Sequence, residues 1–250
     1  MEIILASASP RRSDILGRRG IPFRVLPALD VDESAVSGTA REVARELARR
    51  KADSVLSTLP GAQAGPGTLV IGADTVVEVD GLLLGKPRTR DDSRSMLGRL
   101  AGRTHRVITG IAVGKAGDGF RVEDETSEVI FRALTAEEIE AYIDTGDPEG
   151  KAGAYGIQSG GRGLVAGFRG CYYNIVGLPV ERLLRMLQEA GFESHGATGS
   201  CDCRAHSLWR GGQGCLPDVK SLAALRPNPT VLPAHPVPIG FTGQAGNRPS

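Results

Sequence analysis

The sequence predicts an α/β fold, and two observations support this prediction. Segments with strand-like and helix-like spacing of apolar residues alternate along residues 1–193. The run LVIGADTVV at 69–77 is apolar up to its aspartate, as is typical of a strand in the centre of a sheet. The composition, 40% hydrophobic and 24% charged over 250 residues, is ordinary for a soluble globular protein.

The first predicted unit is a strand that leads into a helix. The apolar residues 3–6 form the strand, Ser9 is suited to cap the helix, and Pro10 suits its first position. The first turn of a helix has unpaired N–H groups and a positive dipole end, so Arg11 and Arg12 beside it would favour a bound phosphate. A capped amphipathic helix with two solvated arginines fits this segment equally well.

The next segments carry clear end signals. Residues 22–26 predict a short strand, and the sequence TARE at 39–42 predicts a capping box that opens a helix to about residue 57. A linker rich in Gly and Pro follows at 60–67. After the apolar strand at 69–77, Asp80 and Gly81 predict a tight turn into residues 82–84.

The second half continues the alternation. Thr89 or a neighbour begins a helix that ends near residue 100. Residues 106–113 and 120–131 predict two long strands joined by a glycine-rich hairpin. The sequence TAEE at 135–138 predicts another capped helix, the irregular residues 151–158 predict a loop of close approach, and residues 178–190 have helical spacing.

The C-terminal segment differs in composition from the rest. Residues 194–250 contain three of the four cysteines and seven of the fifteen prolines, and their formal charge is +3 against −2 for residues 1–193. We predict a folded domain at 1–193 and a mostly disordered tail at 194–250. The tail residues His195, Cys201, Cys203, His206 and Cys215 do not have the spacing of paired Cys-x-x-Cys zinc ligands. Recruitment of a protein partner is an alternative role for the tail.

The composition also limits the kinds of partner that we expect. Neither part has the charge of a dedicated nucleic-acid binder, so no stable nucleic-acid partner is expected. The apolar runs are too short for a membrane span and no signal-peptide pattern opens the chain, so we expect a cytoplasmic protein without a membrane contact.

A pair of carboxylates gives the sequence its main chemical signal. Asp74 follows the apolar strand, where a buried carboxylate needs a partner or a metal, although a turn-forming or capping role is the alternative. Glu33 could hold Mg²⁺ together with Asp74. The alternative is that Glu33 belongs to a solvated acidic loop. Lys51, Lys86 and Lys151 could add positive charge from three separate segments.

Other catalytic signatures are missing from the sequence. It contains no Walker-type loop, dinucleotide fingerprint, zinc-protease helix or nucleophile elbow. A Ser-His-Asp or Cys-His mechanism would depend on His105, the single histidine in residues 1–193. Hydrolysis by metal-activated water fits the residues better.

Several motifs in order resemble the Maf family of nucleoside triphosphate pyrophosphatases. They are SASPRR at 7–12, GADTVV at 72–77, GKP at 85–87, GRTHRVIT at 102–109, KAGAYGIQ at 151–158 and YNIVGLP at 173–179. The resemblance covers nearly all of residues 1–193. It implies a mixed, elongated sheet flanked by helices, with two lobes around a central cleft as in the inosine-triphosphate pyrophosphatases, and a possible homodimer.

The resemblance also implies an activity. Members hydrolyse a nucleoside triphosphate to the monophosphate and pyrophosphate with a divalent cation, Mg²⁺ in the first place, with Mn²⁺ or Co²⁺ as alternatives. The paired arginines, the Ala-Asp-Thr sequence and the Tyr-Gly-Ile-Gln sequence resemble the branch that acts on dTTP and UTP. Two alternatives remain: a nucleotide-sensing module linked to septum formation, and a pyrophosphatase for modified pyrimidine nucleotides.

The resemblance assigns roles to matching residues. Asp74 corresponds to the proton acceptor, and Arg11, Thr75 and Gln158 correspond to positions associated with substrate choice. Gln158 has both a donor and an acceptor, as the imide edge of thymine or uracil requires. The phosphate and metal environment would be completed by Ser7, Arg12, Glu33, Lys51 and Lys86. The sequence departs from the family at Cys171, where a serine is common. It also departs in the tail at 194–250, whose composition could reflect an alternative exon or a shifted reading frame.

Overall fold

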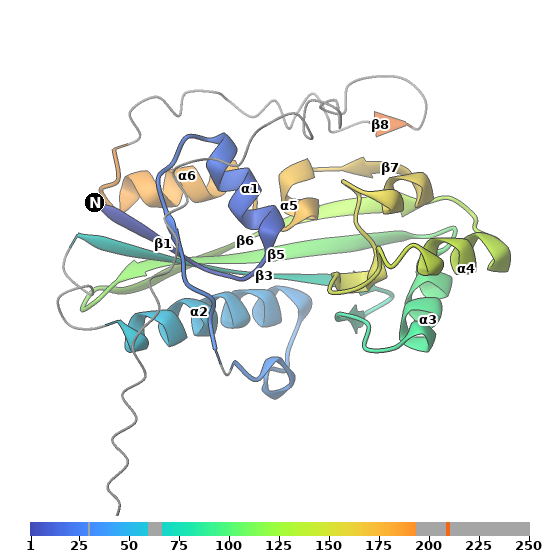
Figure 1. The fold of residues 1–250 in the computed structure, drawn as a ribbon, viewed down its shortest axis with the longest axis horizontal. Helices are drawn as coiled ribbons and strands as arrows, with labels where there is room; N and C mark the ends of the chain where they lie inside the picture. The colour runs from blue at the N-terminus through green and yellow to red at the C-terminus, as the bar shows by residue number, and fades with distance from the viewer. Residues whose placement is uncertain (30, 60–66, 194–208, 211–250) are drawn as a thin grey trace, which may run out of the picture.

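The computed structural model describes residues 1–29, 31–59 and 67–193, together with the backbone of residues 209–210 (Figure 1). The predicted linker at 60–67 and the predicted disordered tail at 194–250 therefore lie almost entirely outside the described residues. Within the described residues, helices and strands alternate, which confirms the predicted α/β class. No helix in this part of the chain is long and apolar enough to cross a bilayer.

The described strands form one mixed sheet, as predicted. The spatial order is β2-β1-β3-β5-β6-β7-β8, and β4 also pairs with β3. β1 runs parallel to β2 and β3, whereas the remaining pairs are antiparallel. The strands are β1 (Glu2–Ala6), β2 (Arg24–Val25), β3 (Thr68–Val79), β4 (Leu82–Leu84), β5 (Thr104–Lys115), β6 (Gly119–Phe131), β7 (Val165–Arg169) and β8 (Trp209–Arg210).

Helices flank both faces of this sheet (Figure 1). They are α1 (Pro10–Arg18), α2 (Ala40–Thr58), α3 (Arg90–Leu100), α4 (Ala136–Asp144), α5 (Tyr172–Val176) and α6 (Val180–Glu189). Short 3-10 turns occupy Glu33–Ala35, Ala152–Ala154 and Gly160–Leu164. α2, α3 and α4 each begin with a capping box, which confirms the start signals at Thr39 and Thr135 and places the start of α3 after Thr89.

α1 begins at Pro10 as predicted, but the side chain of Ser9 does not cap it. Ser9 occupies the cap position without a side-chain cap hydrogen bond. Its N–H instead donates to Ser7 Oγ over 3.2 Å. The prediction that the Ser9 side chain caps α1 is therefore wrong. The hydroxyl of Ser7 instead accepts a hydrogen bond in the loop before α1.

Within residues 1–193, the sequence does not predict the strand β7 or the helix α5. β7 and α5 contain five residues each, too few for apolar periodicity to reveal them. α5 is followed by Gly177 as its C-cap, whose φ of 121° would be strained for any residue with a side chain. Both elements lie inside the last third of the domain, between the loop at 151–158 and α6.

α2 covers one face of the sheet at very close range. A Cβ on Gly72 would lie 2.1 Å from the carbonyl oxygen of Ala48, and a Cβ on Gly110 would lie 2.2 Å from that of Ala44. No real Cβ approaches a backbone oxygen so closely, so glycine is required at both positions. This approach brings Lys51 of α2 onto the sheet.

The opposite face carries two apolar cores. One contains Leu16 of α1 and side chains of α6, and the other contains Leu97 of α3 and Ile143 of α4. Tyr173 and Val176 of α5 pack against both cores. This arrangement matches the predicted two lobes, with α5 as the element that joins them.

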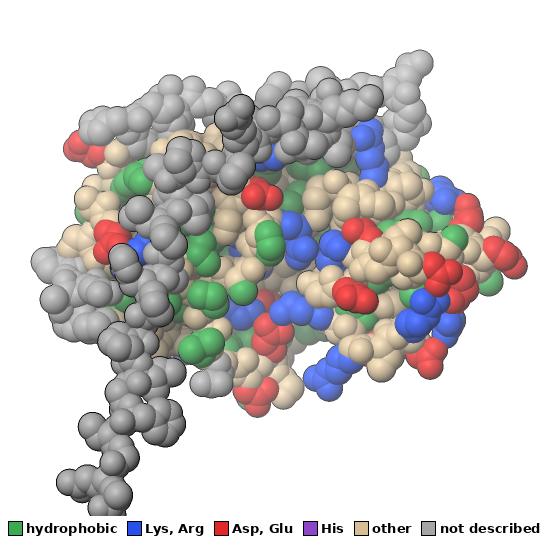
Figure 2. Space-filling model, in the orientation of Figure 1, with side chains coloured by type: hydrophobic (Ala, Val, Ile, Leu, Met, Phe, Trp, Pro, Cys, Tyr) green, Lys and Arg blue, Asp and Glu red, His purple; other side chains and the backbone are tan. Residues whose placement is uncertain are grey.

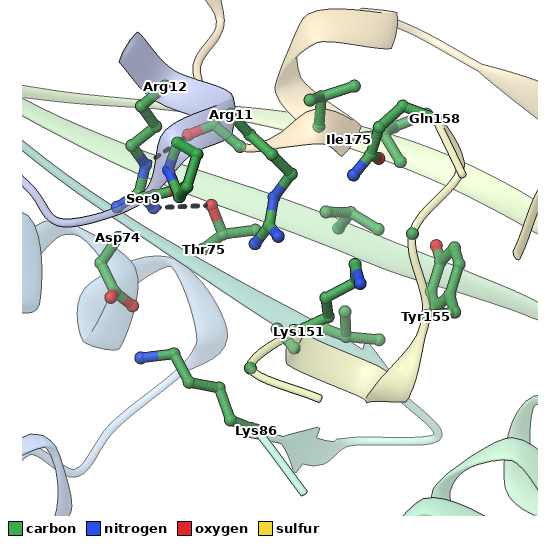
Figure 3. Close-up of a pocket in the computed structure, with 18 of the residues that line it drawn as sticks. Ser9, Arg11, Arg12, Asp74, Thr75, Lys86, Lys151, Tyr155, Gln158 and Ile175 are labelled. Atoms are coloured by element: carbon green, nitrogen blue, oxygen red, sulfur yellow. Dashed lines mark hydrogen bonds between the residues drawn. The ribbon is translucent and has the colours of Figure 1, made fainter. Parts of the chain in front are cut away.

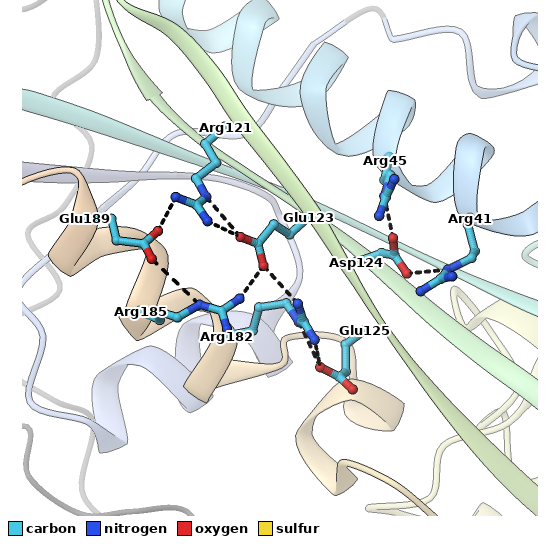
Figure 4. Close-up of polar contacts among 9 residues, drawn as sticks. All are labelled: Arg41, Arg45, Arg121, Glu123, Asp124, Glu125, Arg182, Arg185 and Glu189. Atoms are coloured by element: carbon cyan, nitrogen blue, oxygen red, sulfur yellow. Dashed lines mark hydrogen bonds and ion pairs between the residues drawn. The ribbon is translucent and has the colours of Figure 1, made fainter.

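Ion pairs fasten β6 to the helices on both faces (Figure 4). On one face the fully buried carboxylate of Asp124 pairs with Arg41, over 2.8 Å, and with Arg45 of α2. On the other face Glu123 accepts from Arg182 of α6 over 2.8 Å. A buried carboxylate is costly unless it is paired, so Asp124 fixes where α2 lies over the sheet.

One edge of β3 is left open between two strands. β5 pairs along one edge of β3, so β1 and β4 both pair with its other edge. On that edge β1 pairs with residues 68–72 and β4 pairs with residues 77–79. Asp74 lies in the interval between them. α1 begins four residues after β1 ends, so its N-terminus reaches the same interval. Ligand sites in α/β sheets gather at such strand ends.

His105 belongs to the core and not to a catalytic triad. It is 2% exposed, its ring meets Phe131 and Tyr155 edge to face, and its Nε2 lies 2.8 Å from the Tyr155 hydroxyl. Burial lowers the pKa of His105 to about 3. The imidazole is therefore neutral at any pH at which the protein would work.

We expect acid to destabilise the protein through His105. Below the ordinary pKa of 6.5 the unfolded histidine gains a proton, whereas the folded one stays neutral down to about pH 3. The unfolded state then binds more protons, so stability falls as the pH falls. Between pH 6.5 and pH 5 the wild-type protein should lose roughly 2 kcal/mol more than His105→Gln in urea unfolding. Equal losses in the two proteins would contradict this assignment.

Candidate active site

A pocket of about 440 Å³ lies at the open edge of β3 (Figure 3), and Lys and Arg side chains gather in the middle of the face that Figure 2 shows. Its walls come from the start of α1, from β3 and β5, from the turn after β4, from the loop at 149–158 and from the end of α5. These segments are far apart in the sequence. The pocket therefore exists only because the fold brings both lobes to the open edge of β3.

The pocket has a charged end and an apolar end. Asp74, Lys86 and Arg11 carry charge at one end, and Lys151 adds a further charge between Lys86 and Tyr155 (Figure 3). The apolar lining is made of Val77, Val107, Tyr155, Ile175 and Val176. A ligand with an anionic group and a flat apolar group would match this division.

A chain of alternating charges runs through the charged end. Lys51 Nζ lies 2.5 Å from Asp74 Oδ1 and 2.7 Å from Glu33 Oε1. Lys86 Nζ lies 3.1 Å from the same Glu33 oxygen. Asp74 is 5% exposed, so Lys51 supplies the partner that a buried carboxylate needs.

The pKa of Glu33 reflects the same contacts. Partial burial would raise it, but hydrogen bonds and charge from Lys51 and Lys86 outweigh burial and lower it. Glu33 is thus a carboxylate at neutral pH. It does not line the pocket itself and contacts the lining through Lys86.

The carboxylates fit a divalent cation that is shared with a ligand. Because Glu33 and Asp74 both reach one ammonium nitrogen, a single cation can contact both. Hard cations such as Mg²⁺ prefer such oxygens. Within the described ranges no group of three or more His, Cys, Asp or Glu side chains converges on one point, so further ligands would come from phosphate oxygens and water.

The two arginines of α1 have different surroundings. Arg12 is buried, and its guanidinium donates to Gly177 O over 2.8 Å, to Ser7 Oγ over 3.0 Å and to Thr75 Oγ1 over 3.2 Å. Arg11 extends into the pocket between Thr75 and the loop at 149–158 (Figure 3). Arg12 and Ser7 therefore hold the wall of the pocket, and Arg11 faces its interior.

Burial affects the pKa of both guanidinium groups. It lowers the pKa of Arg12, which the nearby Asp74 partly raises again, and it lowers that of Arg11, which Asp147 partly raises. Both groups remain cations because the pKa of a free guanidinium is far above neutrality. The pocket therefore holds two positive charges at the start of α1.

Thr75 is held from two sides. Besides the bond from Arg12, its hydroxyl lies 2.9 Å from Thr109 Oγ1 of β5. Thr109 in turn donates to the carbonyl oxygen of Asn174 over 3.0 Å. Thr109 and Asn174 lie in two of the quoted motifs, but nothing in the sequence indicated that they contact Thr75.

The loop that carries Gln158 is organised by Asp147, which sequence reasoning missed. Its carboxylate accepts from Tyr142 over 2.5 Å, from Ser159 over 2.9 Å and from Lys151 over 3.1 Å. Burial would raise the pKa of Asp147, but these bonds lower it. The sequence around Asp147 reads as a simple turn, so no signal would have identified it. Gln158 itself lines the pocket opposite α1 (Figure 3).

Cys171 caps the start of α5. Its Sγ accepts from the N–H of Asn174 over 3.4 Å at the N-terminus of α5. Burial raises the pKa of its thiol to about 11. The thiol is therefore neutral, and its sulfur serves as the cap acceptor of α5.

The predicted site residues thus assemble into one region. The residues that line the pocket are Arg11, Arg12, Asp74, Thr75, Lys86, Lys151 and Gln158. Ser7, Glu33 and Lys51 are held against these residues by hydrogen bonds. The fold and the pocket define an α/β protein with a binding site for an anionic ligand that has an apolar part.

The chain belongs to the Maf family. The family model described as "Maf-like protein" matches residues 2–190. Over 192 residues the chain is 47% identical to a dTTP/UTP pyrophosphatase of Symbiobacterium thermophilum, covering 76% of this chain and 95% of that protein. A dTTP/UTP pyrophosphatase of Thermococcus gammatolerans is 48% identical over 191 residues, covering 76% and 97%.

A solved structure also resembles the chain. The nucleoside-triphosphatase, a dITP/XTP pyrophosphatase, of Mycobacterium abscessus superposes with a TM-score of 0.37 at 16% identity, over 52% of this chain and 74% of that one.

We expect the adjacent arginines to respond differently to truncation. Arg12→Ala removes the three hydrogen bonds from its guanidinium to Ser7, Thr75 and Gly177, so it should lower the free energy of unfolding by about 2–4 kcal/mol. Arg11→Ala, the matched control, should change it by less than about 0.5 kcal/mol. Urea denaturation of both variants measures this. The assignment fails if the two variants are equally stable.

Proposed function

We propose that the protein hydrolyses dTTP and UTP to the nucleoside monophosphate and pyrophosphate. The observation that carries this proposal is the position of Asp74, a buried carboxylate held by Lys51 at the open edge of β3, in the same pocket as Arg11 and Lys86. Support also comes from the names of the relatives, which cover the whole domain at 41–48% identity. A role in clearing the nucleotide pool follows from this reaction, and a cytoplasmic location would suit it.

Asp74 is the proton acceptor in the proposed reaction. A water beside its free oxygen gives up a proton to the carboxylate and bonds to the α-phosphorus. The bond from that phosphorus to the bridging oxygen breaks, and pyrophosphate leaves with the electron pair. Lys51 fixes the orientation of the carboxylate, so that one oxygen is bound and the other faces the water.

Cations of the chain balance the charge of the triphosphate. Arg11 and Lys86 extend into the charged end of the pocket, and the first turn of α1 offers unpaired N–H groups there. Ser7 and Arg12, whose side chains are bonded within the protein, position α1 and Thr75 for this contact. Positioning and electrostatics supply most of the rate in phosphoryl transfer.

Glu33 and Asp74 would hold a divalent cation together with the phosphates. Such a cation, when bound, neutralises phosphate charge and makes a water more acidic. We take Mg²⁺ as the first candidate, with Mn²⁺ and Co²⁺ as alternatives for the assay.

The base would occupy the apolar end of the pocket. The apolar side chains at 77, 107, 155, 175 and 176 provide flat contact area, and Gln158 can offer both a donor and an acceptor to a pyrimidine edge. Arg11 and Thr75 lie between this end and the charged end. The protein would act as a homodimer, and light scattering of the purified protein should give twice the mass of one chain.

The substitution Asp74→Asn tests the assignment of the proton acceptor. An amide cannot take a proton from water, so turnover should fall by about 10²–10⁴-fold, with an unchanged circular dichroism spectrum. Asp53→Asn, on the exposed surface of α2, is the matched control and should keep full turnover. An Asp74→Asn protein with nearly normal pyrophosphate release would sink the assignment.

A panel of triphosphates tests the activity itself. With Mg²⁺ present, pyrophosphate release should be faster from dTTP and UTP than from purine triphosphates, and a chelator should abolish it. Binding without release would favour a nucleotide-sensing module. Faster release from altered pyrimidine triphosphates would favour an enzyme for modified nucleotides.

A further inference from the structure

Lys51 occupies the point at which the two carboxylates of the charged end converge. Its Nζ lies 2.5 Å from Asp74 Oδ1 and 2.7 Å from Glu33 Oε1, and its side chain is 13% exposed. Lys51 belongs to α2, which lies directly on the sheet, so the helix holds the ammonium group at this point. A metal cation that is to bind the same two oxygens therefore has to compete with an ammonium group that is already in place.

The charges around this point do not attract a free divalent cation. Among the described residues, the charged side chains that line the pocket or contact such a side chain comprise five cations and four carboxylates. The cations are Arg11, Arg12, Lys51, Lys86 and Lys151, and the carboxylates are Glu33, Asp74, Asp147 and Glu149. This surplus of one positive charge opposes a divalent cation and favours an anion.

A nucleoside triphosphate reverses this balance. Its phosphates carry several negative charges and stay net negative when one divalent cation is bound to them. Arg11 and Lys86 extend into the pocket and can contact phosphate oxygens (Figure 3). The phosphates also bring oxygen ligands for the cation in addition to those of Glu33 and Asp74. A cation that arrives on the triphosphate is therefore attracted, whereas a free cation is not.

We infer that Lys51 is a counter-ion that keeps the divalent cation out of the empty pocket, so that the cation enters only together with the triphosphate. This inference rests on the proposed function and concerns the order of binding. Before the nucleotide binds, Lys51 supplies the charge that the buried carboxylate of Asp74 needs. The substrate of the enzyme is then the complex of the metal with the triphosphate.

The first test measures binding of Mn²⁺ to the protein without nucleotide, and free Mn²⁺ is followed by its electron paramagnetic resonance signal. The wild-type protein should bind no more Mn²⁺ than Asp74→Asn, which gives the background from other surfaces. In Lys51→Met the two carboxylates lose their shared ammonium group, so the affinity for Mn²⁺ should rise at least about tenfold.

Lys86→Met is the matched control. It removes one positive charge from the same pocket, but its ammonium group contacts Glu33 alone and its side chain is 52% exposed. Because exposed ion pairs contribute little, this variant should bind Mn²⁺ less than about threefold more tightly than the wild-type protein. The inference is overturned if Lys86→Met gains as much affinity as Lys51→Met, or if a folded Lys51→Met gains none.

A second test uses the unaltered protein. The probe is a UTP analogue with a methylene group between the α- and β-phosphorus, which cannot release pyrophosphate. The relaxation rate of water protons rises when Mn²⁺ joins a macromolecule. It should stay near the Asp74→Asn background when the wild-type protein is added to Mn²⁺ alone, and should rise when the protein is added to Mn²⁺ with the analogue. An equal rise without the analogue overturns the inference. Should Lys51→Met fail to fold, this comparison decides alone.

The failure of the proposed function has a different outcome. It would appear as an absence of pyrophosphate release from every triphosphate by the wild-type protein. The binding of Mn²⁺ without nucleotide requires no turnover, so the comparison of Lys51→Met with Lys86→Met still decides whether Lys51 excludes the free cation.

Discussion

The buried carboxylate of Asp74 is the constraint on which the rest of the structure depends. A charge at 5% exposure is costly unless another charge meets it, and the partner comes from α2. α2 can bring Lys51 to this point only by lying directly on the sheet, which requires glycine at 72 and 110. The pairing of Asp124 with two arginines of α2 holds the same helix from β6 (Figure 4). Much of one face of the domain thus serves to place a single ion pair.

The other face is organised around Arg12. Consecutive residues of a helix point about 100° apart, so Arg11 and Arg12 of α1 cannot both face the pocket in the same way. One enters the pocket, and the other joins the start of α1 to β3 and to the end of α5. α5 packs against both apolar cores. Arg12 therefore links the two lobes, although its motif suggests a phosphate ligand.

The division of the pocket explains how one site can serve a nucleotide. Charged groups from α1, β3 and the turn after β4 gather at one end, and apolar groups from β3, β5, α5 and the loop at 149–158 line the rest together with Lys151. Thr75 lies between them, and its hydroxyl contacts that of Thr109 on β5. The loop that carries Gln158 is anchored by Asp147 through bonds to Tyr142 and Ser159. Polar groups that are themselves bonded within the protein thus set the shape and polarity of the site.

The sequence by itself determined the α/β class, the capping boxes at Thr39 and Thr135, the buried strand that ends near Asp74 and the family, because these follow from local spacing and from motifs that stand in order. Only the tertiary structure decided that Lys51 meets Asp74, that Arg12 points into the protein, and that Thr109 contacts Thr75. These contacts join segments up to 165 positions apart, and their directions depend on strand register and helix rotation, which no local pattern records.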